Sequence, residues 1–257
     1  MTHHSKYDEV VTLVNAGIAV LLTGEAGSGK TTLANQVADD LGFRFFSQSM
    51  TRQTTLSHLM GFMSVTGVYV SSLLRDCAEN GGIFLLDELD AADANVVLSL
   101  NTIENGYITF PTGIVRLHED FRIMATANPQ DKHEMYTGRS KLDRATLDRF
   151  DIIEMDRDED LEKTLVDHDT FQRVELLRKI MKETNSSTSL SMRDSMRYQK
   201  RKDLGLLDGF VYRLVNKSDL VYTRYTNEAE KMPKHTNQSE CQTFNELVEL
   251  VKLRSEK

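Results

Sequence analysis

The stretch Gly24-Glu25-Ala26-Gly27-Ser28-Gly29-Lys30-Thr31 decides the fold, because it fits the pattern G-x-x-x-x-G-K-[ST] at every fixed position. An apolar run, Ile18–Leu22, precedes it, and a helical pattern, Thr32–Leu41, follows it. Glycines let backbone N–H groups face a phosphate, and the positive end of the following helix faces the same anion. The stretch therefore predicts a phosphate-binding loop between a strand and a helix. The alternative is a glycine-rich turn with a chance lysine.

The residue types of this loop indicate ATP and Mg²⁺ as ligands. We expect Lys30 to reach the β- and γ-phosphates and the Thr31 hydroxyl to bind Mg²⁺. The predicted nucleotide-binding residues are Gly24, Glu25, Ala26, Gly27, Ser28, Gly29, Lys30, Thr31, Thr32 and Asp87. The predicted Mg²⁺ ligands are Thr31 and Asp87.

Two carboxylates follow a second apolar run, Ile83–Leu86, directly. At the carboxyl end of a buried strand, Asp87 would lie beside Mg²⁺, and Glu88 would polarise the water that attacks the γ-phosphate. The alternative is that both residues merely end a strand at the surface. Together with the phosphate-binding loop, the pair favours catalysis of hydrolysis.

An asparagine and three arginines further along the chain are candidate contacts to the γ-phosphate. Asn128 ends another apolar strand and could bind both the phosphate and the attacking water, or be an ordinary turn asparagine before proline. Arg139, Arg144 and Arg149 come next, and an arginine can stabilise a transferring phosphoryl group in a neighbouring subunit. The alternative is a helix with Asp–Arg pairs on its surface, and periodicity does not separate the two.

Apolar runs alternate with helical patterns over residues 18 to 155, which predicts an α/β fold with a parallel sheet. Beyond Asp156 the pattern becomes helical, with Phe171, Val174, Leu177 and Met181 on one stripe. We therefore predict a nucleotide-binding domain over residues 1–156 and a helical domain over residues 157–257. The five predicted strands are Ile18–Leu22, Phe43–Phe46, Ile83–Leu86, Phe121–Ala125 and Ile152–Met155.

Composition excludes several classes of protein. No apolar run reaches the roughly 18 residues of a membrane span, and two cysteines make no disulfide framework, which favours the cytoplasm. The net charge of −8 argues against broad, charge-driven binding to nucleic acid. We expect no membrane partner. Charge argues against direct nucleic-acid binding, although a local basic patch or a partner protein could still supply it.

The order and spacing of four motifs resemble those of AAA+ ATPases: Gly24–Thr31, Leu85–Glu88, Ala125–Asn128 and Leu147–Phe150. The closest resemblance is to the MoxR/CobS-like group, especially CobS-like proteins encoded by bacteriophages, and it covers residues 10 to 155. The longer matching stretches are Leu59–Phe62, Gly67–Tyr69, Gly81–Glu88, Asn105–Gly113, His118–Arg122 and Tyr136–Arg139.

This resemblance implies roles for individual residues. Asn128 matches the sensor-1 asparagine, Arg149 the trans-acting arginine finger, and Arg139 a second arginine of that region. Arg144 stands where relatives often have a small residue and receives no role. Ser191-Met192-Arg193 is similar to the sensor-2 motif, in which Arg193 would reach the γ-phosphate from the lid. The implied catalytic residues are Glu88, Asn128, Arg149, Arg139 and Arg193.

The resemblance also implies an architecture and an activity. It implies a three-layer αβα P-loop NTPase (AAA+) sandwich with a smaller helical lid, assembled as a homo-oligomeric ring, a hexamer. ATP hydrolysis would drive two pore-directed insertions, near residues 56–69 and 107–115, and remodel a partner protein, such as one with a von Willebrand A-type domain. The alternatives are a CobS-like chelatase motor subunit, an ATPase component of phage DNA metabolism, and a slowly hydrolysing scaffold. The expected location is the cytoplasm, that of the host if the chain is phage-encoded.

Overall fold

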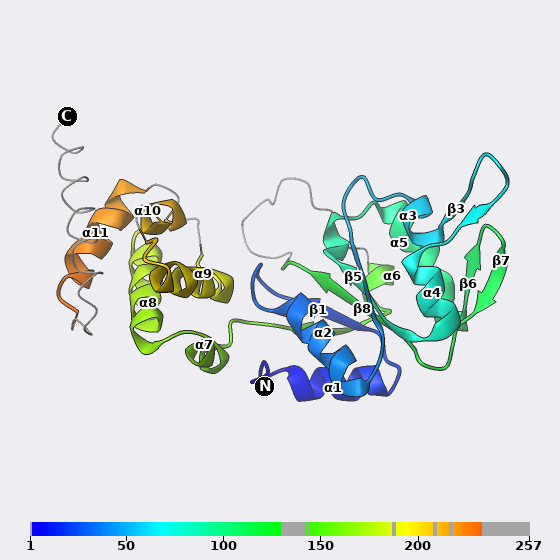
Figure 1. Cartoon of the computed structure of the whole chain (residues 1–257), viewed down its shortest axis with the longest axis horizontal. Helices are drawn as coiled ribbons and strands as arrows, with labels where there is room; N and C mark the ends of the chain where they lie inside the picture. Colours follow the sequence, from blue (N-terminus) through cyan, green and yellow to red (C-terminus); the bar gives the residue numbers. More distant parts are fainter. Residues whose placement is uncertain are drawn as a thin grey trace. The chain divides into compact units, whose positions relative to one another are not determined.

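Five parallel strands form the central sheet of the first of two compact units in the computed structural model of this chain (Figure 1). Their order across the sheet is β2-β5-β8-β1-β9, so β8 lies between β5 and β1. The predicted α/β fold with a five-stranded parallel sheet is confirmed. The strands are β1 (Val20–Thr23), β2 (Phe45–Ser49), β5 (Gly82–Asp87), β8 (Phe121–Ala127) and β9 (Asp151–Glu154).

The structure describes residues 2–129, 142, 144–186, 189–207, 210–215 and 218–232. The first unit spans His3–Asp156, and the second begins at Arg157. Arg139 of the predicted site lies outside the described residues.

Helices cover both faces of the sheet and complete the predicted three-layer sandwich. On one face lie α1 (Tyr7–Asn15) and α2 (Lys30–Leu41), and on the other α4 (Leu73–Asn80) and α5 (Ala94–Leu98). Alternate residues of β5 point to opposite faces, as the pleat of a strand requires. Ile83 and Leu85 therefore pack with α1 and α2, whereas Phe84 and Leu86 pack with α4 and α5. Burying each such side chain stabilises the fold by about 1.5–3 kcal/mol.

Two small hairpins extend from this sandwich. One follows α3 (Leu56–Met60) and pairs β3 (Phe62–Met63) with β4 (Tyr69–Val70), and the other pairs β6 (Tyr107–Phe110) with β7 (Gly113–Arg116). The insertion expected near residues 107–115 is thus a β-hairpin. The remaining short helices of the unit are η1 (Leu89–Ala91), η2 (Ser99–Asn105) and α6 (Arg144–Leu147).

The side chain of Arg75, on α4, lies between the two hairpins. Its guanidinium carbon is 4.7 Å from the centre of the Tyr69 ring and 5.5 Å from that of Phe110. The hairpins therefore lie side by side, as Figure 1 also shows. Their exposed apolar side chains include Phe62, Met63, Val65, Val68, Val70 and Ile114.

The second unit is helical, as its sequence pattern predicts. Three residues of the predicted stripe, Val174, Leu177 and Met181, are buried in its core beside Tyr225. The polar stretch after residue 216, which has no clear sequence pattern, supplies the last described helix. The helices are α7 (Glu159–Leu165), α8 (His168–Glu183), α9 (Met192–Asp203), α10 (Phe210–Leu214) and α11 (Asp219–Ala229).

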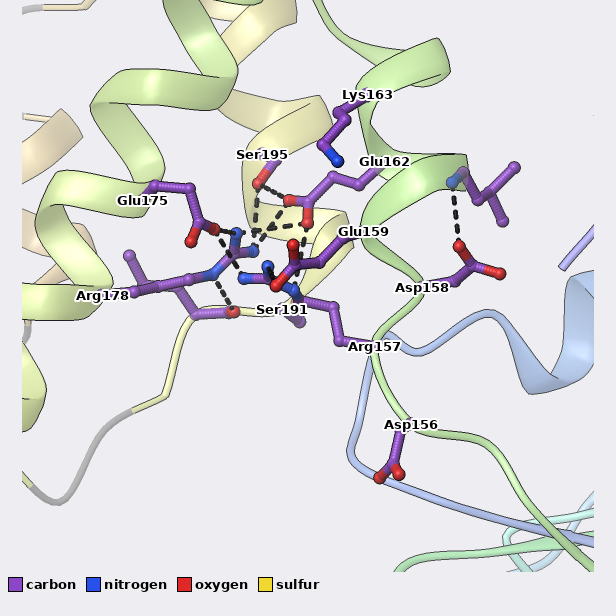
Figure 2. Close-up of polar contacts among 12 residues, drawn as sticks. Asp156, Arg157, Asp158, Glu159, Glu162, Lys163, Glu175, Arg178, Ser191 and Ser195 are labelled. Carbon is purple, nitrogen blue, oxygen red and sulfur yellow. Dashed lines mark hydrogen bonds and ion pairs between the residues drawn. The ribbon is translucent and has the colours of Figure 1, made fainter. Parts of the chain in front are cut away.

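A buried carboxylate, Glu162 of α7, joins three helices of the second unit (Figure 2). Its Oε1 accepts a hydrogen bond from Arg178 Nη2 of α8 at 2.8 Å and another from the Ser195 hydroxyl of α9. Arg157 Nε lies 3.4 Å from Oε2. Burial raises the pKa of neighbouring Glu175, but hydrogen bonds from Arg157 and Arg178 outweigh burial and hold this pKa below its ordinary value. Both carboxylates are thus compensated by arginines of the same unit.

Candidate functional site

The loop between β1 and α2 closes tightly against the chain that follows β9. A Cβ atom at position 24 would lie only 2.2 Å from the Met155 carbonyl oxygen, so Gly24 cannot be replaced without displacing that backbone. At the other end of the loop, Gly29 has φ 94° and caps α2. A left-handed backbone of this kind favours glycine. The shape of the loop therefore depends on the glycines of the sequence motif.

Lys30, the first residue of α2, lies back over this loop. Its Nζ donates hydrogen bonds to the carbonyl oxygens of Gly24 at 2.6 Å and Glu25 at 2.9 Å. The buried Ser28 hydroxyl has no hydrogen-bond partner within the described part of the chain. A buried polar atom without a partner is uncommon in folded proteins. The Lys30 ammonium group, the Ser28 hydroxyl and the N-terminus of α2 together suit a bound phosphate.

Asp87, at the end of β5, is the point where three elements meet. Its Oδ1 accepts a hydrogen bond from the Thr31 hydroxyl of α2 at 3.1 Å and one from the Thr126 hydroxyl of β8 at 2.6 Å. Carboxylate, hydroxyl and water oxygens are the donors that Mg²⁺ prefers. The predicted ligands Thr31 and Asp87 are therefore adjacent and chemically suited to this ion.

Glu88 has an unusual backbone and an exposed side chain. Its φ of 59° and ψ of 47° are left-handed, a conformation that costs a non-glycine residue about 1–3 kcal/mol. Its backbone N–H donates to the Thr126 hydroxyl at 2.8 Å. Such strain gathers at functional sites, and an exposed carboxylate beside a phosphate loop can accept a proton from water.

Thr126 is a residue of this site that sequence reasoning missed. It is only 1 % exposed, yet its hydroxyl contacts both residues of the acidic pair. The strand register explains why, because Leu86 pairs with Ala125 and the next residues of the two strands then lie side by side. The available signal was a single hydroxyl within the apolar run of β8.

Asn128 follows β8 directly and is 6 % exposed. Because β8 lies between β5 and β1, its carboxyl end shares an edge of the sheet with Asp87 and with the start of the phosphate loop. The parallel sheet therefore brings Asn128 to the same edge as the loop and the acidic pair. This is the edge at which open parallel sheets bind ligands.

The predicted arginines are distributed differently. Arg149 Nε lies 3.0 Å from the Glu104 carboxylate, in the short helix before β6. Its side chain is 23 % exposed and lines a mainly apolar pocket with Phe150 and Leu100. Arg193 belongs to the second unit, where it is exposed in the first turn of α9. Arg144, to which no role was given, is exposed and lies 4.0 Å from Asp148.

A glycine-rich loop before a helix, an acidic strand end and a parallel sheet that joins them define the P-loop nucleotide-binding class. Residues 19–150 match the family described as AAA domain (dynein-related subfamily). This range is slightly more than half of the chain, which therefore belongs to that family.

Curated relatives include very large proteins. Midasin of Dictyostelium discoideum is 31 % identical over 152 residues, which cover 56 % of this chain and 2 % of Midasin. Midasin of Giardia intestinalis is 29 % identical over 138 residues, 51 % of this chain and 3 % of the relative. An uncharacterized protein of Staphylococcus epidermidis is 24 % identical over 190 residues, 68 % of this chain and 70 % of that protein. This chain thus spans a very small part of the Midasins.

Among solved structures, NtrX from Brucella abortus in complex with ATP is similar, with a TM-score of 0.54 and 13 % identity. The match covers 78 % of this chain and 51 % of that one, and it supports the fold alone. No helix within the described ranges is long and apolar enough to span a membrane.

Proposed function

We propose that this chain hydrolyses ATP at the carboxyl edge of its sheet, with Glu88 as the general base. One observation carries this proposal: Thr31 of the phosphate-loop helix, Asp87 of β5 and Thr126 of β8 meet within hydrogen-bond distance, directly beside Glu88. The groups that we propose to bind phosphate, hold the metal ion and accept the proton are thereby adjacent. Membership of the AAA family supports nucleotide binding at this loop.

The reaction follows from these positions. Loop N–H groups and Lys30 bind the phosphates, with Lys30 exchanging loop carbonyl oxygens for phosphate oxygens. Thr31 and Asp87 would hold Mg²⁺, which when bound would neutralise charge on the phosphate oxygens. Glu88 takes a proton from water as the water oxygen bonds to the γ-phosphorus. The bond to the bridging oxygen breaks, and ADP leaves with its electron pair. Asn128 orients the attacking water.

We further propose that the chain is a MoxR/CobS-like AAA+ ATPase that acts as a ring, a hexamer, in which each site is completed by a neighbour. Arg149 is the finger that reaches a neighbouring subunit's nucleotide, with Arg139 in support and Arg193 as the sensor of the helical lid. The partly exposed Arg149 side chain and the sequence resemblance support this assignment. Release from Glu104 would free Arg149 for that contact.

The free energy of ATP hydrolysis would drive the remodelling of a partner protein or complex. The two hairpins expose apolar side chains, among them Phe62, Val65 and Ile114, and such surfaces suit contact with a polypeptide. The proposals of a partner with a von Willebrand A-type domain and of a phage origin rest on the resemblance to the MoxR/CobS-like group. The proposed cytoplasmic location rests on the cysteine content.

Substitution of the proposed base tests this function. Glu88→Gln removes the proton acceptor and keeps the shape, so we expect ATP hydrolysis to fall by roughly 10²- to 10⁴-fold with ATP affinity within about threefold of the native value. Glu119→Gln, at an exposed loop position, is the matched control and should be neutral. Release of phosphate by Glu88→Gln at the native rate would remove Glu88 from this role.

A further inference from the structure

Thr126 holds both members of the acidic pair, although the proposed reaction does not consume it. We propose that Thr126 is a positioning residue for hydrolysis: it orients the Asp87 carboxylate and fixes the left-handed backbone of Glu88. This inference rests on the proposed ATPase function and deepens it by naming the group that sets the geometry of the base. Its basis is a buried hydroxyl, 1 % exposed, whose two hydrogen bonds both end at the site.

The directions of these two bonds are fixed by chemistry. The Glu88 N–H can only donate, so the Thr126 oxygen accepts that bond at 2.8 Å. The single hydroxyl hydrogen is then left for Asp87 Oδ1, which accepts at 2.6 Å. The same Oδ1 also accepts from Thr31 at 3.1 Å, so it is held between two hydroxyl groups. Thr126 thereby aims the carboxylate at the phosphate-loop helix.

The peptide group between Asp87 and Glu88 is anchored at both ends. Its carbonyl oxygen accepts a hydrogen bond from the Met50 N–H at 2.7 Å, and its N–H donates to Thr126. The next carbonyl, that of Glu88, accepts from the Ala91 N–H at 2.8 Å. A strained, left-handed residue persists only where its surroundings hold it. Thr126 supplies the side-chain anchor, and its loss would free the peptide that carries the base.

Two substitutions separate the hydroxyl from the shape of the side chain. Thr126→Val keeps the branched shape but removes the hydroxyl, so the Glu88 N–H loses its acceptor and Asp87 loses a donor. Thr126→Ser keeps the hydroxyl and removes only a methyl group. If the valine variant does not fold, Thr126→Ala gives the same test with less bulk.

The first measurement uses the full chain without nucleotide. Amide hydrogen exchange at Glu88, followed by NMR, reports the hydrogen bond to Thr126 directly. We expect exchange to be roughly tenfold faster in Thr126→Val than in the native chain, and near native in Thr126→Ser. Unchanged protection of the Glu88 amide in Thr126→Val would overturn the inference, whether or not the chain hydrolyses ATP.

The second measurement separates turnover from binding. For Thr126→Val we expect kcat to fall by roughly 10- to 100-fold, with ATP affinity within about threefold of native, because misplaced catalytic groups slow chemistry more than binding. Thr126→Ser should restore most of kcat. Native kcat in Thr126→Val, or an equal loss in both variants, would overturn the inference. If Glu88→Gln hydrolyses ATP like the native chain, Glu88 is not the base, and the exchange experiment still decides whether Thr126 holds the Glu88 peptide.

Discussion

The two units of this protein each hold a carboxylate among polar side chains, and they do so in opposite ways. In the first unit, Asp87 accepts hydrogen bonds from the hydroxyls of Thr31 and Thr126. In the second, Glu162 lies between the guanidinium groups of Arg157 and Arg178. Hydroxyls orient a carboxylate without bringing a positive charge, whereas arginines bring positive charges that compensate the carboxylate. The comparison agrees with the proposed ligand-binding role of Asp87, and it indicates that Glu162 serves the fold.

Burial of an acid is therefore a poor guide to function in this molecule. Glu162 has no exposed side-chain surface, yet its partners all belong to its own unit: Arg157 before α7, Arg178 of α8 and Ser195 of α9. Asp87 is partly exposed and lies beside a loop whose buried Ser28 hydroxyl has no hydrogen-bond partner among the residues that the structure describes. The type of partner, hydroxyl or guanidinium, separates the two sites better than burial does.

The largest effect on stability should come from the second unit. Glu162→Gln leaves two arginines facing a neutral group, and breaking a buried ion pair in this way costs about 3–5 kcal/mol. Urea unfolding, with hydrogen exchange to place the loss in α7, α8 and α9, measures this change. ATP affinity should stay within about threefold of native.

A matched control lies in the same unit. Glu183→Gln breaks an ion pair with Arg224 in which both side chains are 40 % exposed, and it should cost about 0.5 kcal/mol or less. If the two variants lost the same free energy of unfolding, burial would add nothing to the Glu162 cluster. That result would contradict a structural role for this cluster.

In the first unit we expect a large loss of ATP affinity with little loss of stability. Lys30→Ala removes the ammonium group over the phosphate loop, so ATP affinity should fall by roughly 100-fold, while the free energy of unfolding changes by about 1 kcal/mol or less. Isothermal titration and urea unfolding give the two quantities. Lys6→Ala, which breaks an exposed ion pair with Glu9, should leave both unchanged. A large loss of stability with native ATP affinity would make Lys30 a structural residue.

The half-exposed carboxylate of Asp167 should contribute less to the free energy of unfolding than Glu162 does. Burial raises its pKa, but hydrogen bonds from the Thr170 N–H, Lys202 and Gln199 outweigh burial and lower the pKa to about 2. Because the folded-state pKa is lowered, the stabilisation is present above the unfolded pKa of about 4 and is lost as the pH falls toward 2.

Asp167→Asn should therefore cost about 1 kcal/mol at pH 7, once screening of the 46 % exposed side chain is allowed for. Urea unfolding as a function of pH should show this cost shrinking between pH 4 and pH 2. The control, Asp160→Asn, is 94 % exposed and should show little cost at any pH. A cost for Asp167→Asn that persists at pH 2 would assign the effect to packing rather than charge.

The fold could be read from the sequence because its signals are local. The apolar run Ile83–Leu86, preceded by glycines and ended by carboxylates, predicts β5 to within one residue of each observed end. The end of β2 lies three residues beyond its predicted end at Phe46. The spacing of Gly24–Thr31 likewise predicted the turn from β1 into α2. Positions such as Asn128 then follow from the edge that parallel strands share.

The contacts that hold the two carboxylates could not be read in this way. Thr126 reaches Asp87 across 39 residues of sequence, and only the register of β5 against β8 brings them together. Arg178 reaches Glu162 across 16 residues through the packing of two helices. Both depend on tertiary geometry that periodicity does not encode. The polar stretch that forms α11 carries only a weak apolar stripe, so periodicity alone does not predict the bounds of this helix.

The most direct test of the central claim is the specific ATPase rate measured against protein concentration, with sedimentation of the same samples with and without ATP and Mg²⁺. We expect the rate per chain to climb as rings form, because Arg149 of one subunit completes the site of the next. A rate that does not change with concentration in a persistent monomer would contradict the ring mechanism, and no hydrolysis at any concentration would contradict the assignment of the Asp87–Glu88 site to ATP turnover.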